Sequence, residues 1–393
     1  MPTPPPNPPA GDLHSFQAGR RLQSLDVLRG VAVLLVLFRH IGYGGVPAEL
    51  PGFLFGPLTL LERMGWTGVD LFFVLSGFLV SSLLFRDFLK HGRIDWKSFL
   101  IRRGLKIYPS FYLLMAVTVL IIVVRHPAVP ASHLVGEFLF LQNYVGYFWN
   151  HTWTLAVEEH FYLALPLLLI AYRACHRGES RPFRHLPRFF IGLFVVVLGL
   201  RLLTQALAPA GPFDSVRSLI PTHLRIDSLA FGVLISYFHH FQPEAFHRFF
   251  RRTRYLLPVA ALLCYLPSMG FEIEHSPFLY TFGFTLLYLG NGALVILALH
   301  LPFSANLIVR ALARIGVYSY SIYLWHILVA LSICPRLSPF LPQAHHESWS
   351  LLCYLAGSIL FGTAMGKLVE VPVLKLRDRF FPSPSGTLAG SAD

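Results

Sequence analysis

The chain has 393 residues, of which 54% are apolar and only 13% are charged, and its mean hydropathy is +0.57. This composition is too apolar and too poor in charge for an ordinary soluble domain, so it indicates a membrane protein with several spans. The 32 basic side chains outnumber the 20 acidic ones. In a membrane protein the placement of the cations is more informative than their sum, and we expect no nucleic-acid partner.

Apolar runs long enough to cross a bilayer recur along the whole chain, so we expect an all-α, polytopic membrane bundle of about ten transmembrane helices. Basic residues gather in alternate connections, which by the positive-inside rule places both termini in the cytoplasm (N-in/C-in). The expected spans are 27–43, 66–86, 105–124, 155–172, 189–207, 223–239, 255–270, 277–300, 316–334 and 349–370.

The segments outside the spans are expected to be tails and connections. The proline-rich start predicts a disordered cytoplasmic tail over residues 1–22, followed by one membrane domain over 23–380 and a flexible tail over 381–393. Residues 134–150 cannot span without inverting every later connection, so we expect a re-entrant or an interfacial segment on the outer side. Four scattered cysteines without a CxxC motif argue against a thiolate metal centre, and we expect no metal site.

The first expected span contains the stretch "VLRGVAVLLVLFRH", with cations at both ends. Arg29 and His40 are eleven residues apart, which places them on one helix face and separates them by ~16 Å along the axis. Either these side chains only anchor the helix at the two membrane surfaces, or they belong to a site. Asp26 lies one turn before Arg29 and can pair with it.

Further polar side chains interrupt the later spans, and each has a structural and a functional interpretation. Arg102, Arg103 and Lys106 either anchor the third span on its cytoplasmic side or clamp a phosphate-rich ligand. Glu158 lies early in an apolar helix, where the helix dipole alone favours a carboxylate.

Three more stretches contain polar residues with plainer structural explanations. Asp70 can be an interfacial carboxylate, and Gly77 is typical of close helix packing. Arg225 and Asp227 can form a mutual pair. A lone histidine among aromatic residues, such as His326, is usually a hydrogen-bonded core residue.

Together these stretches resemble the membrane-bound acyltransferase-3 family. The resemblance covers roughly residues 25–380, and its pieces follow one another in the family's order. They are "LDVLRGVAVLLVLFRH", "GVDLFFVLSGFL", "RRGLKIYP", "TWTLAVEEHFYL", "RIDSLAFGVLI", "YSYSIYLWH" and "VEVP".

The resemblance implies transfer of an acyl group, with acetyl expected, from cytoplasmic acyl-CoA to a hydroxyl group of an acceptor on the outer side. The family's catalytic histidine corresponds to His40 and its conserved carboxylate to Glu158. Residues implied to meet the donor are Arg29, Arg102, Arg103 and Lys106. Residues expected to support the site are Asp26, Asp70, Ser76, Trp153, Arg225, Asp227, Tyr320 and His326.

Two positions depart from the family's pattern. Lys106 stands where the family has arginine, which replaces a bidentate phosphate contact by a point charge. Thr154 replaces a serine and keeps the hydroxyl group. Many relatives also carry an extracytoplasmic esterase-like domain, so we expect its step to be absent or to be supplied by a separate acyl-handling protein.

Acyl transfer to a hydroxyl needs a base that works near neutral pH, and imidazole suits this task. His40 can act as that base or carry the acyl group itself, and Glu158 can orient it if the two spans touch. We expect acyl-CoA as a co-substrate, no bound cofactor, and a bacterial cytoplasmic (inner) membrane location. The expected acceptor is a saccharide or glycolipid, with a macrolide-like small molecule as the alternative and a transporter or flippase as the rival class.

Overall fold

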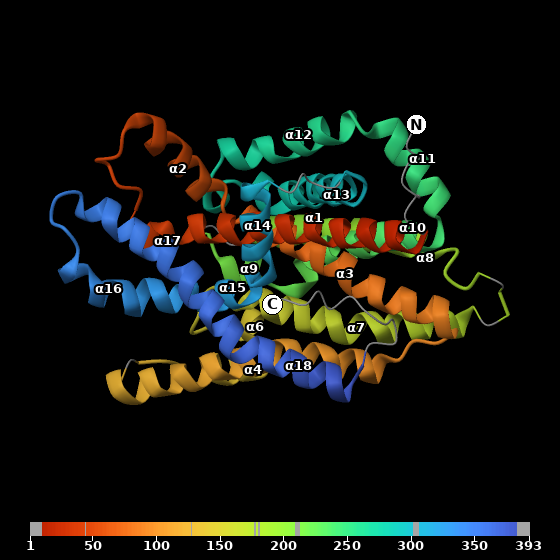
Figure 1. Cartoon of the computed structure of the whole chain (residues 1–393), viewed down its shortest axis with the longest axis horizontal. Coiled ribbons are helices and arrows are strands. Elements are labelled where there is room, and N and C mark those ends of the chain that lie inside the picture. The colour runs from red at the N-terminus through yellow and green to blue at the C-terminus, as the bar shows by residue number, and fades with distance from the viewer. Residues whose placement is uncertain are drawn as a thin grey trace, which may run out of the picture.

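The computed structural model describes residues 10–382 apart from 44, 127, 177, 180, 209–212 and 302–305. Its regular elements in these ranges are all helical, as expected (Figure 1). The α-helices are α1 (Ala10–Arg39), α2 (Gly52–Met64), α3 (Thr67–His91), α4 (Trp96–Arg125), α5 (Ala131–Phe138), α6 (Gln142–Val145), α7 (Trp153–Cys175), α8 (Leu186–Ala206), α9 (Ser215–Ser218), α10 (Ile226–Phe241), α11 (Pro243–Thr253), α12 (Leu256–Gly270), α13 (Phe284–His300), α14 (Leu307–Val317), α15 (Ser319–Leu328), α16 (Cys334–Leu337), α17 (His346–Met365) and α18 (Val371–Phe380).

Seven helices of the described residues are long and apolar enough to cross a membrane. They are Thr67–His91, Trp96–Arg125, Trp153–Cys175, Leu186–Ala206, Leu279–His300, Ser319–Phe340 and His346–Phe380. The expected spans in α1, α10 and α12 are not among them. With 16 and 15 residues, α10 and α12 are shorter than the ~20 residues that a straight crossing needs. The helical class is confirmed, whereas the count of ten and the orientation stay predictions.

The segment expected on the outer side, 134–150, contains two short helices, α5 and α6, rather than a span. One buried carboxylate, Glu137, holds this segment to the start of α7. Its Oε1 atom accepts hydrogen bonds from the backbone N–H groups of Phe148 (3.0 Å) and Trp149 (2.7 Å), and from the hydroxyl of Thr152 (3.1 Å). Its re-entrant or interfacial placement stays a prediction.

The expected tail over residues 1–22 lies partly outside the described residues. Residues 1–9 and 383–393 are not described, but the backbone is helical from Ala10, within α1. The proline-rich run ends at Pro9, and proline in a helix interior removes a backbone hydrogen bond. The described residues of α1 contain no proline.

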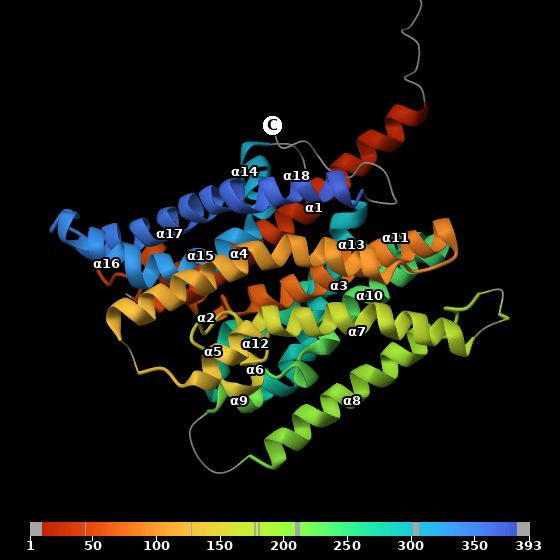
Figure 2. The same cartoon turned by 90° about the horizontal axis from the view of Figure 1, so that it is seen from below.

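Helices α3 and α10 are in close contact at the centre of the bundle. Glycine residues at their crossing allow the two backbones to approach this closely. A Cβ atom on Gly77 would lie 1.9 Å from the carbonyl oxygen of Leu229, and one on Gly232 would lie 2.2 Å from that of Val74. Two glycines thus let the two backbones touch, which confirms the packing role expected for Gly77. Around this centre, α4, α17 and α18 run along one side of the bundle and α8 runs along the opposite side (Figure 2).

Candidate active site

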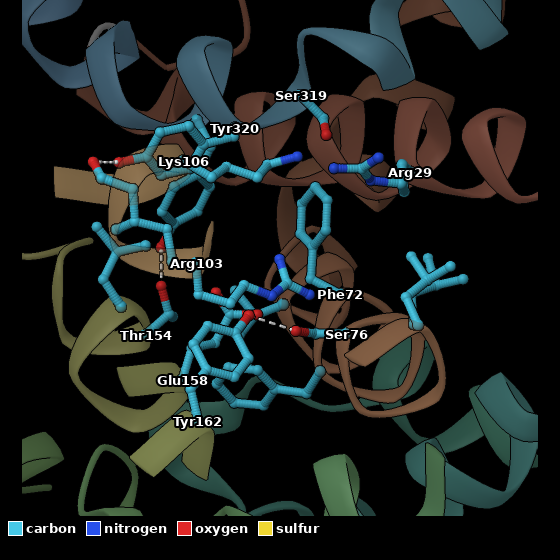
Figure 3. Close-up of a pocket in the computed structure, with 17 residues that line it drawn as sticks. Arg29, Phe72, Ser76, Arg103, Lys106, Thr154, Glu158, Tyr162, Ser319 and Tyr320 are labelled. Carbon is cyan, nitrogen blue, oxygen red and sulfur yellow. Dashed lines mark hydrogen bonds between the residues drawn. The ribbon is translucent and has the colours of Figure 1, made fainter. Parts of the chain in front are cut away.

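A pocket of about 720 Å³ opens between α1, α3, α4, α7 and α15, and three cations line it (Figure 3). We call it the cationic pocket. Arg29 comes from α1, and Arg103 and Lys106 come from successive turns of α4. The other lining residues are Val69, Phe72, Phe73, Leu75, Ser76, Leu79, Ile107, Thr154, Leu155, Glu158, Tyr162, Ser319, Tyr320 and Tyr323.

Glu158 lies beside Ser76 and Tyr162 on the wall that faces Arg103 (Figure 3). The hydroxyl groups of Ser76 and Tyr162 are hydrogen bonded to each other at 2.6 Å. The guanidinium of Arg103 lies over the Tyr162 ring, 4.8 Å from its centroid, and its Nε atom is buried without a hydrogen-bond partner. Arg103 therefore has donor capacity that the described protein atoms do not use.

The other two cations of this pocket have carboxylate partners outside its lining. Arg29 contacts Asp26 at 3.3 Å, which confirms the pair expected one turn apart. Lys106 lies 3.9 Å from Glu370, whose other oxygen accepts a hydrogen bond from Ser321 at 2.8 Å. Glu370 belongs to the "VEVP" stretch, and the sequence analysis assigned it no partner.

Arg102 points away from the cationic pocket, although it is next to Arg103 in the chain. It contacts Asp378 of α18 at 3.1 Å and also donates a hydrogen bond to the carbonyl oxygen of Phe381. Consecutive residues of a helix are ~100° apart around its axis, so two neighbouring arginines cannot face one cavity equally. The structure thus separates a pair that the sequence analysis treated as one clamp.

A second pocket, of about 860 Å³, contains His40, and we call it the histidine pocket. His151 and Arg39 share its wall, and Arg39 forms an ion pair with Glu274. The remaining lining residues are Val36, Trp66, Val69, Tyr147, Asn150, Trp153, Phe213, Ser215, Leu219, Ile220, Arg225, Ile273, Glu274 and Tyr323.

A buried histidine, His326, contacts His40 but does not line the histidine pocket. Its Nε2 atom lies 3.2 Å from Nδ1 of His40, which is also 2.9 Å from the carbonyl oxygen of Val36. The His326 ring is fully buried and its centroid lies 5.0 Å from that of the His151 ring. His326, which the sequence suggested to be a core histidine, is therefore a neighbour of His40, the candidate base.

Two residues, Val69 and Tyr323, line both pockets and separate them. The Tyr323 hydroxyl is 2.7 Å from the hydroxyl of Thr154 and donates to the carbonyl oxygen of His151 at 2.5 Å. Glu158 lies in the cationic pocket and His40 in the histidine pocket. The structure thus does not bring these two expected partners into one pocket.

Two ion pairs are buried close to Arg225, which lines the histidine pocket, and they correct one expectation. Arg225 pairs with Asp70 at 2.8 Å, whereas Asp227 pairs with Arg201 at 2.5 Å. The expected pair of Arg225 with Asp227 is wrong, because Arg225 precedes α10 whereas Asp227 lies in its first turn, and each side chain meets a different partner. Asp70 is fully buried within the protein.

The two aromatic residues named from the sequence also lie in the pocket walls. Trp153 packs edge-on against Phe73, and the guanidinium of Arg225 lies 5.5 Å from its ring centroid. Tyr320 donates a hydrogen bond to the carbonyl oxygen of Ile107 at 2.6 Å, which joins α15 to α4. In the part of the chain that the structure describes, no cluster of three His, Cys, Asp or Glu side chains is arranged to hold a metal ion.

Two residues at or beside the pockets, His151 and Arg201, were not predicted from the sequence as site residues. The signal for Arg201 was its place inside an apolar span, since a charge there is costly. His151 offered no comparable signal, because a histidine just before a helix is common.

Comparison with known proteins identifies a matching family model and several similar proteins. A family model described as an acyltransferase domain matches residues 22–367. Peptidoglycan O-acetyltransferase OatA of Listeria monocytogenes is 26% identical over 382 residues, which cover 90% of this chain and 56% of the relative. The putative peptidoglycan O-acetyltransferase YrhL of Bacillus subtilis is 26% identical over 344 residues, covering 82% of this chain and 50% of the relative.

A third relative, O-acetyltransferase OatA of Staphylococcus aureus, is 24% identical over 407 residues, covering 96% of this chain and 62% of the relative. The chain thus spans roughly half of the length of the curated relatives it matches. No solved structure matches it.

Proposed function

The chain belongs to the acyltransferase-3 family, and from this premise we propose that it is a membrane O-acyltransferase. Its apolar helices and its bacterial relatives identify it as a multi-pass bacterial membrane protein. The proposed reaction moves an acetyl group from cytoplasmic acetyl-CoA to a hydroxyl of a cell-envelope saccharide. We propose the cytoplasmic membrane as its location, with about ten spans and both termini inside.

The observation that carries this proposal is the pair of pockets that meet at Val69 and Tyr323. Phosphate groups of a CoA donor suit the cationic pocket, since arginine and lysine are the usual phosphate-binding side chains. With the proposed orientation, Arg29 faces the cytoplasmic side and His40 the outer side of one continuous helix and its 3-10 extension. A donor held by the cations therefore reaches toward a base that an outer acceptor can meet.

In the proposed reaction His40 takes the proton of the acceptor hydroxyl as its oxygen attacks the thioester carbonyl. The carbon–sulfur bond then breaks, and the imidazolium returns its proton to the departing CoA thiolate. In the alternative the imidazole itself forms the acyl intermediate, which the hydroxyl later attacks. In either route Glu158 does not contact the imidazole of His40. It contributes to the site from its position beside Arg103 in the cationic pocket.

A saccharide acceptor is supported by the names of the relatives, two of which are described as peptidoglycan O-acetyltransferases, one of them putative. A macrolide-like small molecule is the alternative acceptor. We also propose that an extracytoplasmic acyl-handling protein can receive the acyl group. The rival class is a flippase that carries a substrate along the same two pockets.

The test uses the full chain reconstituted in liposomes with acetyl-CoA and a soluble peptidoglycan fragment. Mass spectrometry should find the fragment heavier by one acetyl group, and CoA should be released in equal amount. His40→Ala should abolish both products, whereas His275→Ala, which removes an 80% exposed histidine, should not. Passage of the fragment across the bilayer without acetylation would favour the flippase, and full activity of His40→Ala would remove the proposed base.

A further inference from the structure

The hydrogen bonds around His326 determine which of its nitrogens carries a proton. Its Nδ1 atom lies 2.5 Å from the carbonyl oxygen of Tyr323. A carbonyl oxygen only accepts, so Nδ1 of His326 must be the donor. The ring is fully buried against a carbonyl group, the Tyr323 ring and two other imidazoles, an environment in which a charged ring is costly. A neutral ring has one N–H group, and Nε2 of His326 is therefore an acceptor.

The same reasoning then determines the proton of His40. Two acceptors lie within hydrogen-bond distance of its Nδ1 atom: the carbonyl oxygen of Val36 at 2.9 Å and Nε2 of His326 at 3.2 Å. Both neighbours are acceptors, so the proton of a neutral His40 ring is on Nδ1. The basic lone pair is then on Nε2, the nitrogen on the far side of the ring.

We propose that His326 is a positioning residue that holds His40 in the tautomer whose Nε2 atom accepts the substrate proton. This inference rests on the proposed function, with His40 as the base. His326 has no exposed surface, so it acts on the substrate only through His40. A carboxylate performs this task in serine hydrolases, whereas here a neutral imidazole and a helical carbonyl group share it.

Because Nδ1 of His40 has two acceptors, the carbonyl group of Val36 can still hold the proton there when His326 is replaced. Loss of His326 should therefore lower the activity without abolishing it. When the imidazolium forms during turnover, Nε2 of His326 continues to accept its Nδ1–H group. Removing one such hydrogen bond should lower kcat about tenfold. The KM values for acetyl-CoA and for the acceptor should stay within about twofold, because His326 touches neither.

Two amide variants separate the two nitrogens of His326. In His326→Gln the longer side chain can place an amide oxygen near the former Nε2 atom, which keeps an acceptor for His40. In His326→Asn the shorter side chain can replace only the Nδ1 donor to Tyr323, and the acceptor is removed. Both variants bury an amide at one site, so a merely structural role would affect them alike.

The experiment measures kcat and both KM values for the full chain in liposomes, with wild type and His40→Ala beside the two variants. We expect His326→Asn to lose about tenfold in kcat and His326→Gln to recover most of that loss. Equal kcat values for the two amides, or a change confined to KM, would overturn the positioning role. If the wild type transfers no acetyl group, the proposed function fails instead, so the two failures are distinguishable.

Discussion

Replacing Arg103 by alanine should weaken the binding of acyl-CoA, whereas the same change at Arg102 should not. Arg103 lines the cationic pocket and its Nε atom lacks a partner among the described atoms. Arg102 faces α18, where Asp378 and the carbonyl group of Phe381 hold its guanidinium. The two residues are adjacent and chemically identical, so each is a matched control for the other.

The size of the effect follows from the hydrogen bond that each variant removes. A hydrogen bond between a guanidinium and a phosphate is worth ~1.5–3 kcal/mol, which corresponds to a roughly 10- to 150-fold rise in KM for acyl-CoA in Arg103→Ala. The ion pair of Arg102 with Asp378 is partly exposed, with side-chain accessibilities of 20% and 37%. Such a pair contributes at most ~1 kcal/mol to stability. Arg102 does not line the cationic pocket, so the donor KM in Arg102→Ala should change less than about threefold.

The assay is the initial rate of CoA release against donor concentration at saturating acceptor, repeated against acceptor concentration at saturating donor. A donor-specific rise in KM for Arg103→Ala alone would support the cationic pocket as the donor site. An equal rise for both variants would show that α4 acts by a general surface charge. A rise in only the acceptor KM would reverse our assignment of the two pockets.

Three further predictions concern stability, measured by thermal unfolding in detergent. Asp70→Asn leaves the buried guanidinium of Arg225 without its charged partner and should cost ~3–5 kcal/mol, and a change below ~1 kcal/mol would contradict that pair. Gly77→Ala should cost ~1–3 kcal/mol or more by overpacking α3 against α10, whereas Gly199→Ala, which meets nothing within 4 Å, should be neutral or stabilising. Burial raises the pKa of Glu137 to about 7, so the folded state holds a proton that the unfolded state releases near pH ~4.3. Stability should fall as the pH rises toward 7, and an equally steep fall in Glu137→Gln would exclude this carboxyl as the cause.

Local features of the fold were accessible from the sequence because they depend on neighbours along the chain. The contact of Arg29 with Asp26 follows from helical spacing, and the packing role of Gly77 follows from its place in an apolar helix. Helix length was less accessible. The apolar run of α10 predicts a span, but the helix ends after 16 residues at Phe241.

Long-range partners were not accessible, because charge alone does not select among several possible partners. Arg225 had a carboxylate two residues away, yet it pairs with Asp70, which is 155 residues distant. Nearness along the chain suggested Asp227 as the partner, and no property of the sequence pointed to Asp70 instead. The same limit applied to Arg102 and Arg103, because helical phase separates them by ~100° without telling which one faces the cavity.

Tyr323 joins the two halves of the site, and this explains why a substitution there would be a poor probe of either half. Its ring lines both pockets, its hydroxyl contacts Thr154 and the His151 carbonyl group, and its own carbonyl group orients His326. Tyr323→Phe removes the hydroxyl but keeps the ring and the carbonyl group. It should therefore disturb the wall between the two pockets and leave the tautomer of His40 unchanged. The amide pair at His326 instead changes the tautomer support and leaves both pocket linings intact. Separating transfer between the pockets from proton removal at His40 therefore requires both sets of variants.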